Sequence, residues 1–384
     1  MDVRYITTQQ EAVDYLKISS ASFIWKFDAA VDDHVDMPVM CAFDGDRMIA
    51  GSEVLPFSTN YCGTFINAVV ASGVCSIPEA RRLGGVRAIF EKIEEIALEK
   101  DWTIGLLFPF SISYYEKFGY ANLNRLFAIR VPFANMNNIP RCTDVIPYSD
   151  EHFEEISALH GKCALKENLM TLHNDKQFFC DKPLENADYT YFHRDENGVA
   201  DGYVRFTVSR PETLFVNDLY VLNSSALNAL IGFLRNYDGI VKNLVVRNQY
   251  PGSPFSLLAD RIPDAFYDYN GGCAGRIYNL KKLLEVNKYP EEYGRFSLKS
   301  LDHLPQNTGI FDVEYEHGKA TVTRRVEGDY DLALSVTAAA RLMLAGEGHS
   351  MDSAAFINGV EIKESAKDFF RAFPYRPTRF IESF

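Results

Sequence analysis

The sequence predicts an α/β protein with two or three domains. A chain of 384 residues exceeds the roughly 250–300 residues at which a single hydrophobic core stops growing. Apolar residues make up 47% of the chain and charged residues 24%, as in ordinary globular proteins. Short β-branched and aromatic runs alternate with stretches whose apolar residues recur at helical spacing, which indicates mixed strands and helices.

The first segment, to about residue 134, is expected to alternate strands and helices. In the stretch with the clearest helical spacing, Ile89, Ile93 and Ala97 fall on one face. Helices are expected over residues 9–22, 86–100 and 111–117. Strands are expected over residues 38–43, 48–57, 65–70, 71–77 and 103–108.

Asparagine, proline and polar residues between positions 135 and 148 indicate a domain boundary. The second segment, to about residue 272, is expected to hold helices over 151–163 and 226–237 and strands over 189–193, 200–208, 215–222 and 243–247. The third segment begins near residue 273. It is expected to hold a hairpin of strands 310–315 and 320–325 and helices over 336–345 and 366–373.

Several classes of protein do not fit this sequence. No apolar run approaches the ~20 residues of a spanning helix, and the start lacks the basic and apolar regions of a signal peptide, so we expect a cytoplasmic protein. The seven cysteines are scattered without a CxxC pair, which predicts reduced thiols. The eight histidines show no ligand spacing, so no metal is expected.

The chain is acidic, because 39 Lys and Arg minus 52 Asp and Glu gives −13. Nucleic-acid binding depends on Lys and Arg that neutralise phosphates, so nucleic acid is not an expected partner, and neither is a membrane. Net negative charge favours a cationic substrate if the acidic residues line the site. It also serves solubility alone, and composition does not separate these two interpretations.

The most informative stretch is Val74-Cys75-Ser76-Ile77-Pro78-Glu79-Ala80-Arg81-Arg82-Leu83-Gly84-Gly85-Val86-Arg87. It predicts a strand that enters a basic, glycine-containing loop, which in turn opens a helix. A helix start presents unpaired N–H groups and a positive dipole end, glycines permit close backbone approach, and arginines suit a pyrophosphate. The stretch lacks both the Walker pattern and GxGxxG.

This loop resembles the Arg-x-x-Gly loop of GNAT-superfamily acetyltransferases, with Arg81 and Gly84 in the matching positions. The run Tyr115-Glu116-Lys117-Phe118-Gly119-Tyr120 resembles the GNAT segment that flanks the acetyl thioester. The wider resemblance, over nearly the whole chain, is to the Eis-like (enhanced intracellular survival) family. It implies a catalytic GNAT domain over 1–134, a degenerate GNAT-like domain over 135–272, a sterol-carrier-like α+β domain over 273–384, and a homohexamer.

The resemblance also implies roles for particular residues. Acetyl-CoA is expected to bind through Val74, Ser76, Arg81, Arg82, Gly84, Gly85 and Arg87. Tyr115 is expected to act as general acid and the terminal carboxylate of Phe384 as general base, because an alkylammonium must lose a proton before it attacks a thioester. Tyr114 competes with Tyr115 for the role of acid, and Glu116 competes for the role of base.

The predicted reaction is direct transfer of acetyl from acetyl-CoA to a primary amine of a small cationic substrate, such as an aminoglycoside, a polyamine or a lysine-like amine. Phe23, Trp25 and Glu382 are candidate substrate contacts. No Arg-x-x-Gly loop precedes the second segment's helix at residue 226, so that segment is not expected to bind CoA. Two alternatives stay open: an acyltransferase for longer chains, and a non-catalytic protein that binds a ligand or a partner.

Overall fold

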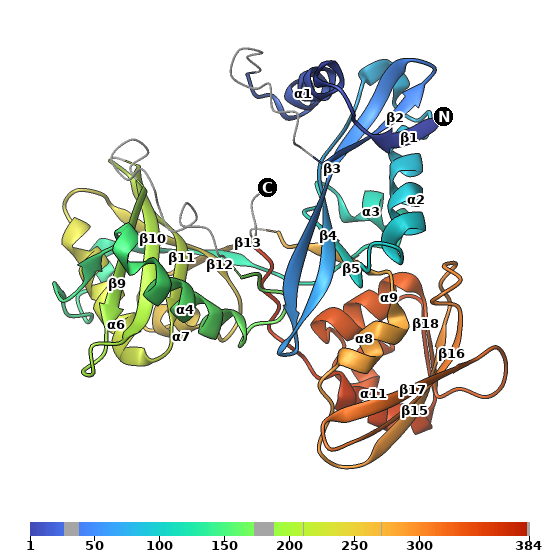
Figure 1. Cartoon of the computed structure of the whole chain (residues 1–384). Helices are drawn as coiled ribbons and strands as arrows, with labels where there is room; N and C mark the ends of the chain where they lie inside the picture. The colour runs from blue at the N-terminus through green and yellow to red at the C-terminus, as the bar shows by residue number, and fades with distance from the viewer. Residues whose placement is uncertain (27–37, 173–187, 210, 270, 382–384) are drawn as a thin grey trace. The chain divides into compact units, whose positions relative to one another are not determined.

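The computed structural model describes residues 1–26, 38–172, 188–209, 211–269 and 271–381 (Figure 1). The chain forms two compact units. The first unit joins Met1–Leu123 to Cys273–Arg376, and the second unit joins Asn124–Gly272 to Pro377–Ile381. Each unit therefore includes a segment from late in the chain.

A seven-stranded sheet with the order β1-β2-β3-β4-β5-β14-β6 forms the centre of the first unit. Neighbouring strands are antiparallel except β4 and β5, which are parallel. The strands are β1 (Asp2–Tyr5), β2 (Val39–Asp44), β3 (Arg47–Tyr61), β4 (Thr64–Ser76), β5 (Ile104–Leu107), β6 (Ala121–Asn122) and β14 (Ala274–Ile277). The sequence predicted β2 to β5 but missed the short strands β1, β6 and β14.

Two helices, α1 (Gln9–Phe23) and α2 (Gly85–Ala97), cover opposite faces of this sheet. Tyr15 of α1 packs in a cluster with Cys41 of β2, whereas the apolar face of α2 packs with Met40. Successive residues of a strand point to opposite faces, so the two clusters lie on the two sides of the sheet. Both helices were predicted, because their apolar residues recur at helical spacing.

The sequence predicted two strands, 65–70 and 71–77, where the structure has the single strand β4. The interruption in the pattern falls near Gly73, which has a φ of 57° and lies close to a bulge in the pairing with β3. A bulge with a left-handed glycine breaks the alternation of side chains without ending the strand. The parallel pairing with β5 stops at Val70 and Leu106, so the end of β4 has no strand on that side among the described strands.

Two strands lie across the predicted domain boundaries. The strand β7 (Phe127–Pro132) pairs with β12 (Asn243–Gln249) in the second unit, although the predicted first domain extends to residue 134. The strand β14 follows the predicted boundary at residue 273 but lies between β5 and β6 in the first sheet. Sheet membership depends on long-range pairing, which composition along the chain does not show.

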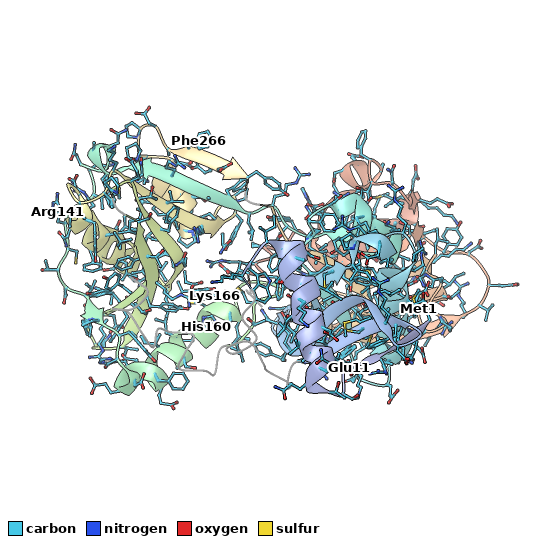
Figure 2. The ribbon with its side chains drawn as sticks, turned by 90° about the horizontal axis from the view of Figure 1, so that it is seen from above. Met1, Glu11, Arg141, His160, Lys166 and Phe266 are labelled. Carbon is cyan, nitrogen blue, oxygen red and sulfur yellow. The ribbon has the colours of Figure 1, made fainter. Side chains whose placement is uncertain are left out.

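A second seven-stranded sheet, with the order β13-β7-β12-β11-β10-β9-β8, forms the second unit. Its other strands are β8 (Ile146–Pro147), β9 (Asp188–Arg194), β10 (Ala200–Ser209), β11 (Thr213–Val221) and β13 (Phe266–Tyr269). Its main helices are α4 (Phe153–Ala164), α6 (Ser224–Leu234) and α7 (Pro254–Ala259). The edge strand β13 was not predicted, and Figure 2 shows its Phe266 on the periphery of this unit.

Residues 377–381 pack on the second unit. The backbone N–H of Asn168 donates to the carbonyl of Pro377 at 2.9 Å, and the N–H of Arg379 donates to the carbonyl of Asn168 at 2.9 Å. The Arg379 guanidinium pairs with Glu167 at 3.3 Å, and Phe380 is 0% exposed. Backbone hydrogen bonds, an ion pair and a buried aromatic ring therefore hold this segment in place.

The rest of the first unit is a five-stranded sheet with the order β17-β16-β15-β18-β19, packed with helices. The strands are β15 (Gly294–Ser300), β16 (Gly309–Glu316), β17 (Lys319–Arg325), β18 (Leu332–Leu334) and β19 (Val360–Ile362). The helices include α8 (Leu280–Val286), α9 (Val336–Ala340) and α11 (Lys367–Ala372). The predicted hairpin is β16 and β17. The predicted helix over 336–345 changes to a π-helical turn at Arg341–Ala345, which apolar spacing does not distinguish from an α-helix.

The packing of residues 377–381 can be tested with Phe380→Ala. Because the side chain is fully buried, its removal should destabilise the second unit by about 3 kcal/mol or more. Chemical denaturation, followed by far-UV circular dichroism, measures this loss of unfolding free energy. Phe356→Ala is the matched control, because Phe356 is 91% exposed. Equal stability of the two variants would contradict the packing of this segment.

Candidate active site

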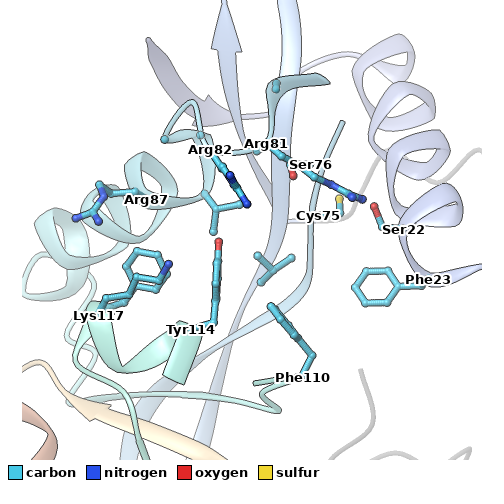
Figure 3. Close-up of a pocket in the computed structure, with 17 residues that line it drawn as sticks. Ser22, Phe23, Cys75, Ser76, Arg81, Arg82, Arg87, Phe110, Tyr114 and Lys117 are labelled. Atoms are coloured by element: carbon cyan, nitrogen blue, oxygen red, sulfur yellow. The ribbon is translucent and has the colours of Figure 1, made fainter. Parts of the chain in front are cut away.

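One cavity of about 770 Å³ in the first unit gathers residues from the end of β4, the start of α2, the end of α1 and the segment 110–118 (Figure 3). Its lining includes every residue predicted to bind CoA, namely Val74, Ser76, Arg81, Arg82, Gly84, Gly85 and Arg87. The structure therefore brings these residues to one surface.

The end of β4 contributes backbone to the cavity. Val74, Cys75 and Ser76 line it, and they lie beyond Val70, the last residue of β4 that pairs with β5. Backbone N–H and C=O groups on an unpaired strand edge can bond to an extended ligand that carries amide groups, as an added strand would.

The start of α2 also faces the cavity. Its N-cap is Gly84, with a φ of 92°, and no side chain within the described ranges caps this helix end. The first N–H groups of the helix and the positive end of its dipole are therefore available to an anion. Gly85 lies in close packing, because a Cβ there would lie 3.0 Å from the Cβ of Ala50, a contact that would push the neighbouring side chain aside.

Among the residues that the structure describes, the lining carries four cationic residues, Arg81, Arg82, Arg87 and Lys117, and no Asp or Glu. All four are exposed, and none forms an ion pair with another residue in the part of the chain that the structure describes. Like charges that share one cavity repel each other, so an anionic ligand stabilises this arrangement. Sequence reasoning missed Lys117, whose segment was interpreted through its aromatic residues.

Aromatic side chains form one wall of the cavity. Phe118 lines it and stacks on the buried Phe90, with ring centroids 4.6 Å apart and an interplanar angle of 7°. Tyr114 also lines the cavity, and the Nζ of Lys117 lies 4.0 Å from the centroid of the Tyr114 ring. This contact holds the ammonium group against the wall.

Tyr115, the predicted general acid, lies behind this wall. It is 3% exposed, and its ring centroid lies 5.1 Å from that of Tyr114 and 5.6 Å from that of Phe110. Tyr114 and Phe110 line the cavity, whereas Tyr115 does not. Burial raises the pKa of both phenols, and the nearby Arg87 opposes the increase at Tyr114. Both phenols are therefore protonated at neutral pH.

The candidate substrate contacts are placed differently. Phe23 lines the cavity and is 54% exposed, and Figure 3 shows it at the end opposite to Arg87 and Lys117. Trp25 is not among the residues that line the cavity, and it follows Ile24, which ends α1 in the left-handed conformation with a φ of 59°. Phe110, which is 77% exposed, lines the same cavity and was not predicted.

The two predicted residues near the end of the sequence, Glu382 and Phe384, lie outside the described residues. Glu116, the alternative base, is exposed and is not part of the cavity lining. The role of Phe384 stays a prediction.

Solved structures share this fold over the whole chain. A probable N-acyltransferase from Enterococcus faecalis is 18% identical, with a TM-score of 0.88 and coverage of 100% of this chain and 99% of that chain. A GCN5-related N-acetyltransferase from Anabaena variabilis is 19% identical, with a TM-score of 0.85 and full coverage of both chains (100% and 100%). Eis1 from Mycobacterium abscessus is 17% identical, with a TM-score of 0.78 and 100% coverage of both chains.

Two family profiles match the sequence itself. Each describes an acetyltransferase (GNAT) domain, and they match residues 2–123 and 172–269. The chain therefore contains two acetyltransferase (GNAT) domains, and it shares its overall fold with Eis1. No curated protein sequence matches it. The first GNAT match contains the basic loop and the Tyr115 segment, so the cavity lies in the first GNAT domain.

The second GNAT domain differs at the corresponding helix start. The N-cap of α6 is Asn223, whose side chain accepts a hydrogen bond from the N–H of Ala226 at 2.8 Å. This side chain occupies a donor that at α2 is left for a ligand. Together with the missing Arg-x-x-Gly loop, this supports the prediction that the second domain does not bind CoA.

Within the described ranges, no group of three or more His, Cys, Asp or Glu is arranged to hold a metal ion. None of the helices in those ranges is long and apolar enough to cross a membrane.

The charge of the loop can be tested with Arg82→Glu. Reversal of one cation in this cavity, whose described lining holds no carboxylate, should weaken acetyl-CoA binding by about 10- to 100-fold, measured by calorimetry. Lys92→Glu is the control, because Lys92 lies on the same helix, pairs with Glu95 and is absent from the cavity lining. An unchanged affinity of Arg82→Glu for acetyl-CoA would contradict the prediction that this loop binds acetyl-CoA.

Proposed function

We propose that the chain transfers the acetyl group of acetyl-CoA to a primary amine of a small cationic substrate, by direct attack in a ternary complex. The observation that carries the proposal is the cavity itself. Within the described part of the chain, it combines four cations that form no ion pair, a helix start without a side-chain cap and a strand edge without a neighbouring strand. GNAT acetyltransferases use acetyl-CoA. Its pyrophosphate suits the cations and the helix start, and its amide-containing arm suits the strand edge.

The residues present fit this donor. Arg81, Arg82 and the start of α2 would hold the pyrophosphate, since charge-assisted hydrogen bonds and a helix dipole both favour phosphate. The backbone of Val74 and Ser76 would pair with the amides of the pantetheine arm. The acetyl thioester would then point toward the aromatic wall that contains Tyr114 and covers Tyr115.

The acceptor would approach from the end of the cavity that holds Phe23 and Phe110. Both rings are more than half exposed, and aromatic faces attract ammonium groups by cation–π interaction. The described lining contains no carboxylate, so charge recognition by Asp or Glu must come from outside it. Before attack, the ammonium must lose a proton. We assign the role of general base, which accepts this proton, to the terminal carboxylate of Phe384, with Glu116 as the alternative.

A phenol would assist the departure of the CoA thiolate. Tyr115 is the first residue of the segment, residues 115–120, that resembles the GNAT segment beside the thioester. Its raised pKa keeps the phenol protonated at neutral pH but makes complete transfer of that proton to the thiolate more costly. Hydrogen-bond donation to the developing thiolate suits such a group. Tyr114, which lines the cavity, is the alternative donor.

The two tyrosines can be separated by Tyr115→Phe and Tyr114→Phe. Loss of an acid–base group should lower kcat by about 10²- to 10⁴-fold with little change in acetyl-CoA affinity. Release of free thiol from acetyl-CoA, with a panel of polyamines and aminoglycosides as acceptors, measures turnover. We expect the large loss in Tyr115→Phe. A fully active Tyr115→Phe beside an inactive Tyr114→Phe would transfer the role to Tyr114.

The same assay separates the proposed donor from longer acyl chains. Palmitoyl-CoA and hexanoyl-CoA should be poorer donors than acetyl-CoA at equal concentration. Faster turnover with either would favour the longer-chain acyltransferase instead. Absence of thiol release with every donor and amine would favour a protein that binds without catalysis.

We also propose a cytoplasmic protein that assembles as a homohexamer and whose five-stranded sheet is a sterol-carrier-like domain. The assembly and the sterol-carrier-like domain follow from the Eis-like resemblance. Sedimentation velocity across a wide concentration range should give a single species of about six times the chain mass of 43.5 kDa. A monomer at all concentrations would contradict the assembly.

A further inference from the structure

A carboxylate on β3 lies beside the open end of β4, just outside the cavity lining. Oε1 of Glu53 lies 3.3 Å from the hydroxyl oxygen of Tyr15, which donates to the carbonyl of Gly73 at 3.2 Å. A Cβ on Gly73 would lie 3.4 Å from the same Oε1. Glu53 therefore borders the residue that directly precedes Val74, which lines the cavity.

The helix α1 connects this carboxylate to the cavity. Ser22 and Phe23 follow Tyr15 by seven and eight residues, which puts all three on one face of the helix. Tyr15 contacts Glu53, whereas Ser22 and Phe23 line the cavity. Figure 3 shows Cys75 on the side of the cavity that holds Ser22 and Phe23. Burial, with a smaller contribution from the nearby Glu53 carboxylate, raises the pKa of the Cys75 thiol to about 12.

The charge of Glu53 has no cationic partner. Among the described residues, no Lys, Arg or His forms an ion pair with Glu53, which is only partly exposed. Burial raises the pKa of its carboxyl, and hydrogen bonds with Tyr15 and Ser72 oppose the increase. The Tyr15 hydroxyl has one proton, so Glu53 competes for it with the Gly73 carbonyl. A ligand that carries positive charge and N–H donors would stabilise such a carboxylate.

The proposed placement of the donor directs its thioester toward this carboxylate. The pyrophosphate is assigned to the loop and the start of α2, which follow the end of β4 in the chain. An arm that pairs first with Ser76 and then with Val74 runs back along β4, toward Gly73. A side chain beside Gly73 can therefore contact an amine that approaches the thioester.

We propose that Glu53 binds the ammonium group of the acceptor and thereby selects cationic amines. This inference rests on the proposed transfer of acetyl to such an amine, and it supplies the carboxylate that the described cavity lining lacks. Tyr15 positions the carboxylate through its hydroxyl. The proton that the ammonium loses still goes to the general base assigned above, so Glu53 serves as a binding group.

The test is Glu53→Gln, which keeps the shape of the side chain and removes its charge. The Kd of spermidine for the CoA-saturated enzyme should rise about tenfold or more, the effect of losing one charge-assisted contact, and its KM should rise by a similar factor. The Kd of acetyl-CoA should change less than about twofold. Calorimetry measures both Kd values, and thiol release measures the KM. If another polyamine or an aminoglycoside of the panel turns over faster, that amine replaces spermidine.

Two variants serve as controls. Glu95→Gln removes a carboxylate that pairs with Lys92 on α2, outside the cavity lining, and it should leave both Kd values unchanged. Glu53→Asp keeps the negative charge, so it should bind spermidine more tightly than Glu53→Gln does.

The possible outcomes separate this inference from the proposed function. Unchanged spermidine affinity in Glu53→Gln, with thiol release intact, would overturn the role of Glu53 and leave the proposed function standing. A loss of affinity for both spermidine and acetyl-CoA, together with a lower denaturation midpoint, would also overturn it, because Glu53 would then only support the fold. Absence of thiol release by wild type with every amine of the panel would instead overturn the proposed function.

Discussion

The parallel pairing of β4 and β5 ends at Val70 and Leu106, while β4 continues to Ser76. A strand that extends beyond the end of its neighbour exposes backbone N–H and C=O groups that need other hydrogen-bond partners. The basic loop, the start of α2 and the segment 110–118 all border this part of β4 in one cavity. Had β5 followed β4 to its end, the same arginines and aromatic rings would flank a closed sheet. The site therefore depends on where one strand pairing stops.

A buried guanidinium links α2 to the segment 110–118 through direct contacts. Arg276 of β14 is 1% exposed, donates a hydrogen bond to the carbonyl of Phe118 and pairs with Glu94 of α2 at 2.7 Å. Gly119, with a φ of 78°, leaves room for this approach. One side chain from late in the chain thus joins the helix that faces the donor to the segment that carries Tyr115. Loss of one partner of such a buried pair leaves an uncompensated charge, which is strongly destabilising.

Much of the architecture could be predicted because it is local. The apolar residues of α2 recur at helical spacing, and the loop from Arg81 to Gly84 is contiguous, so both could be read along the chain. The same holds for the hairpin β16–β17. The short strands β1, β6 and β14 could not be predicted, since two to four residues carry little periodicity. The bulge near Gly73 divided one strand into two for a related reason: it interrupts the alternation on which the prediction depends.

The sequence by itself determined the class of fold, the donor loop and the segment with Tyr115, because each is encoded in consecutive residues. Tertiary structure decided which neighbours share a surface. It placed Lys117 and Phe110 in the cavity, put Tyr114 at the cavity wall and Tyr115 behind it, and inserted β14 into the first sheet. These outcomes depend on strand pairing and on the direction of each side chain. Both are fixed by packing between residues far apart in the chain, which no local pattern records.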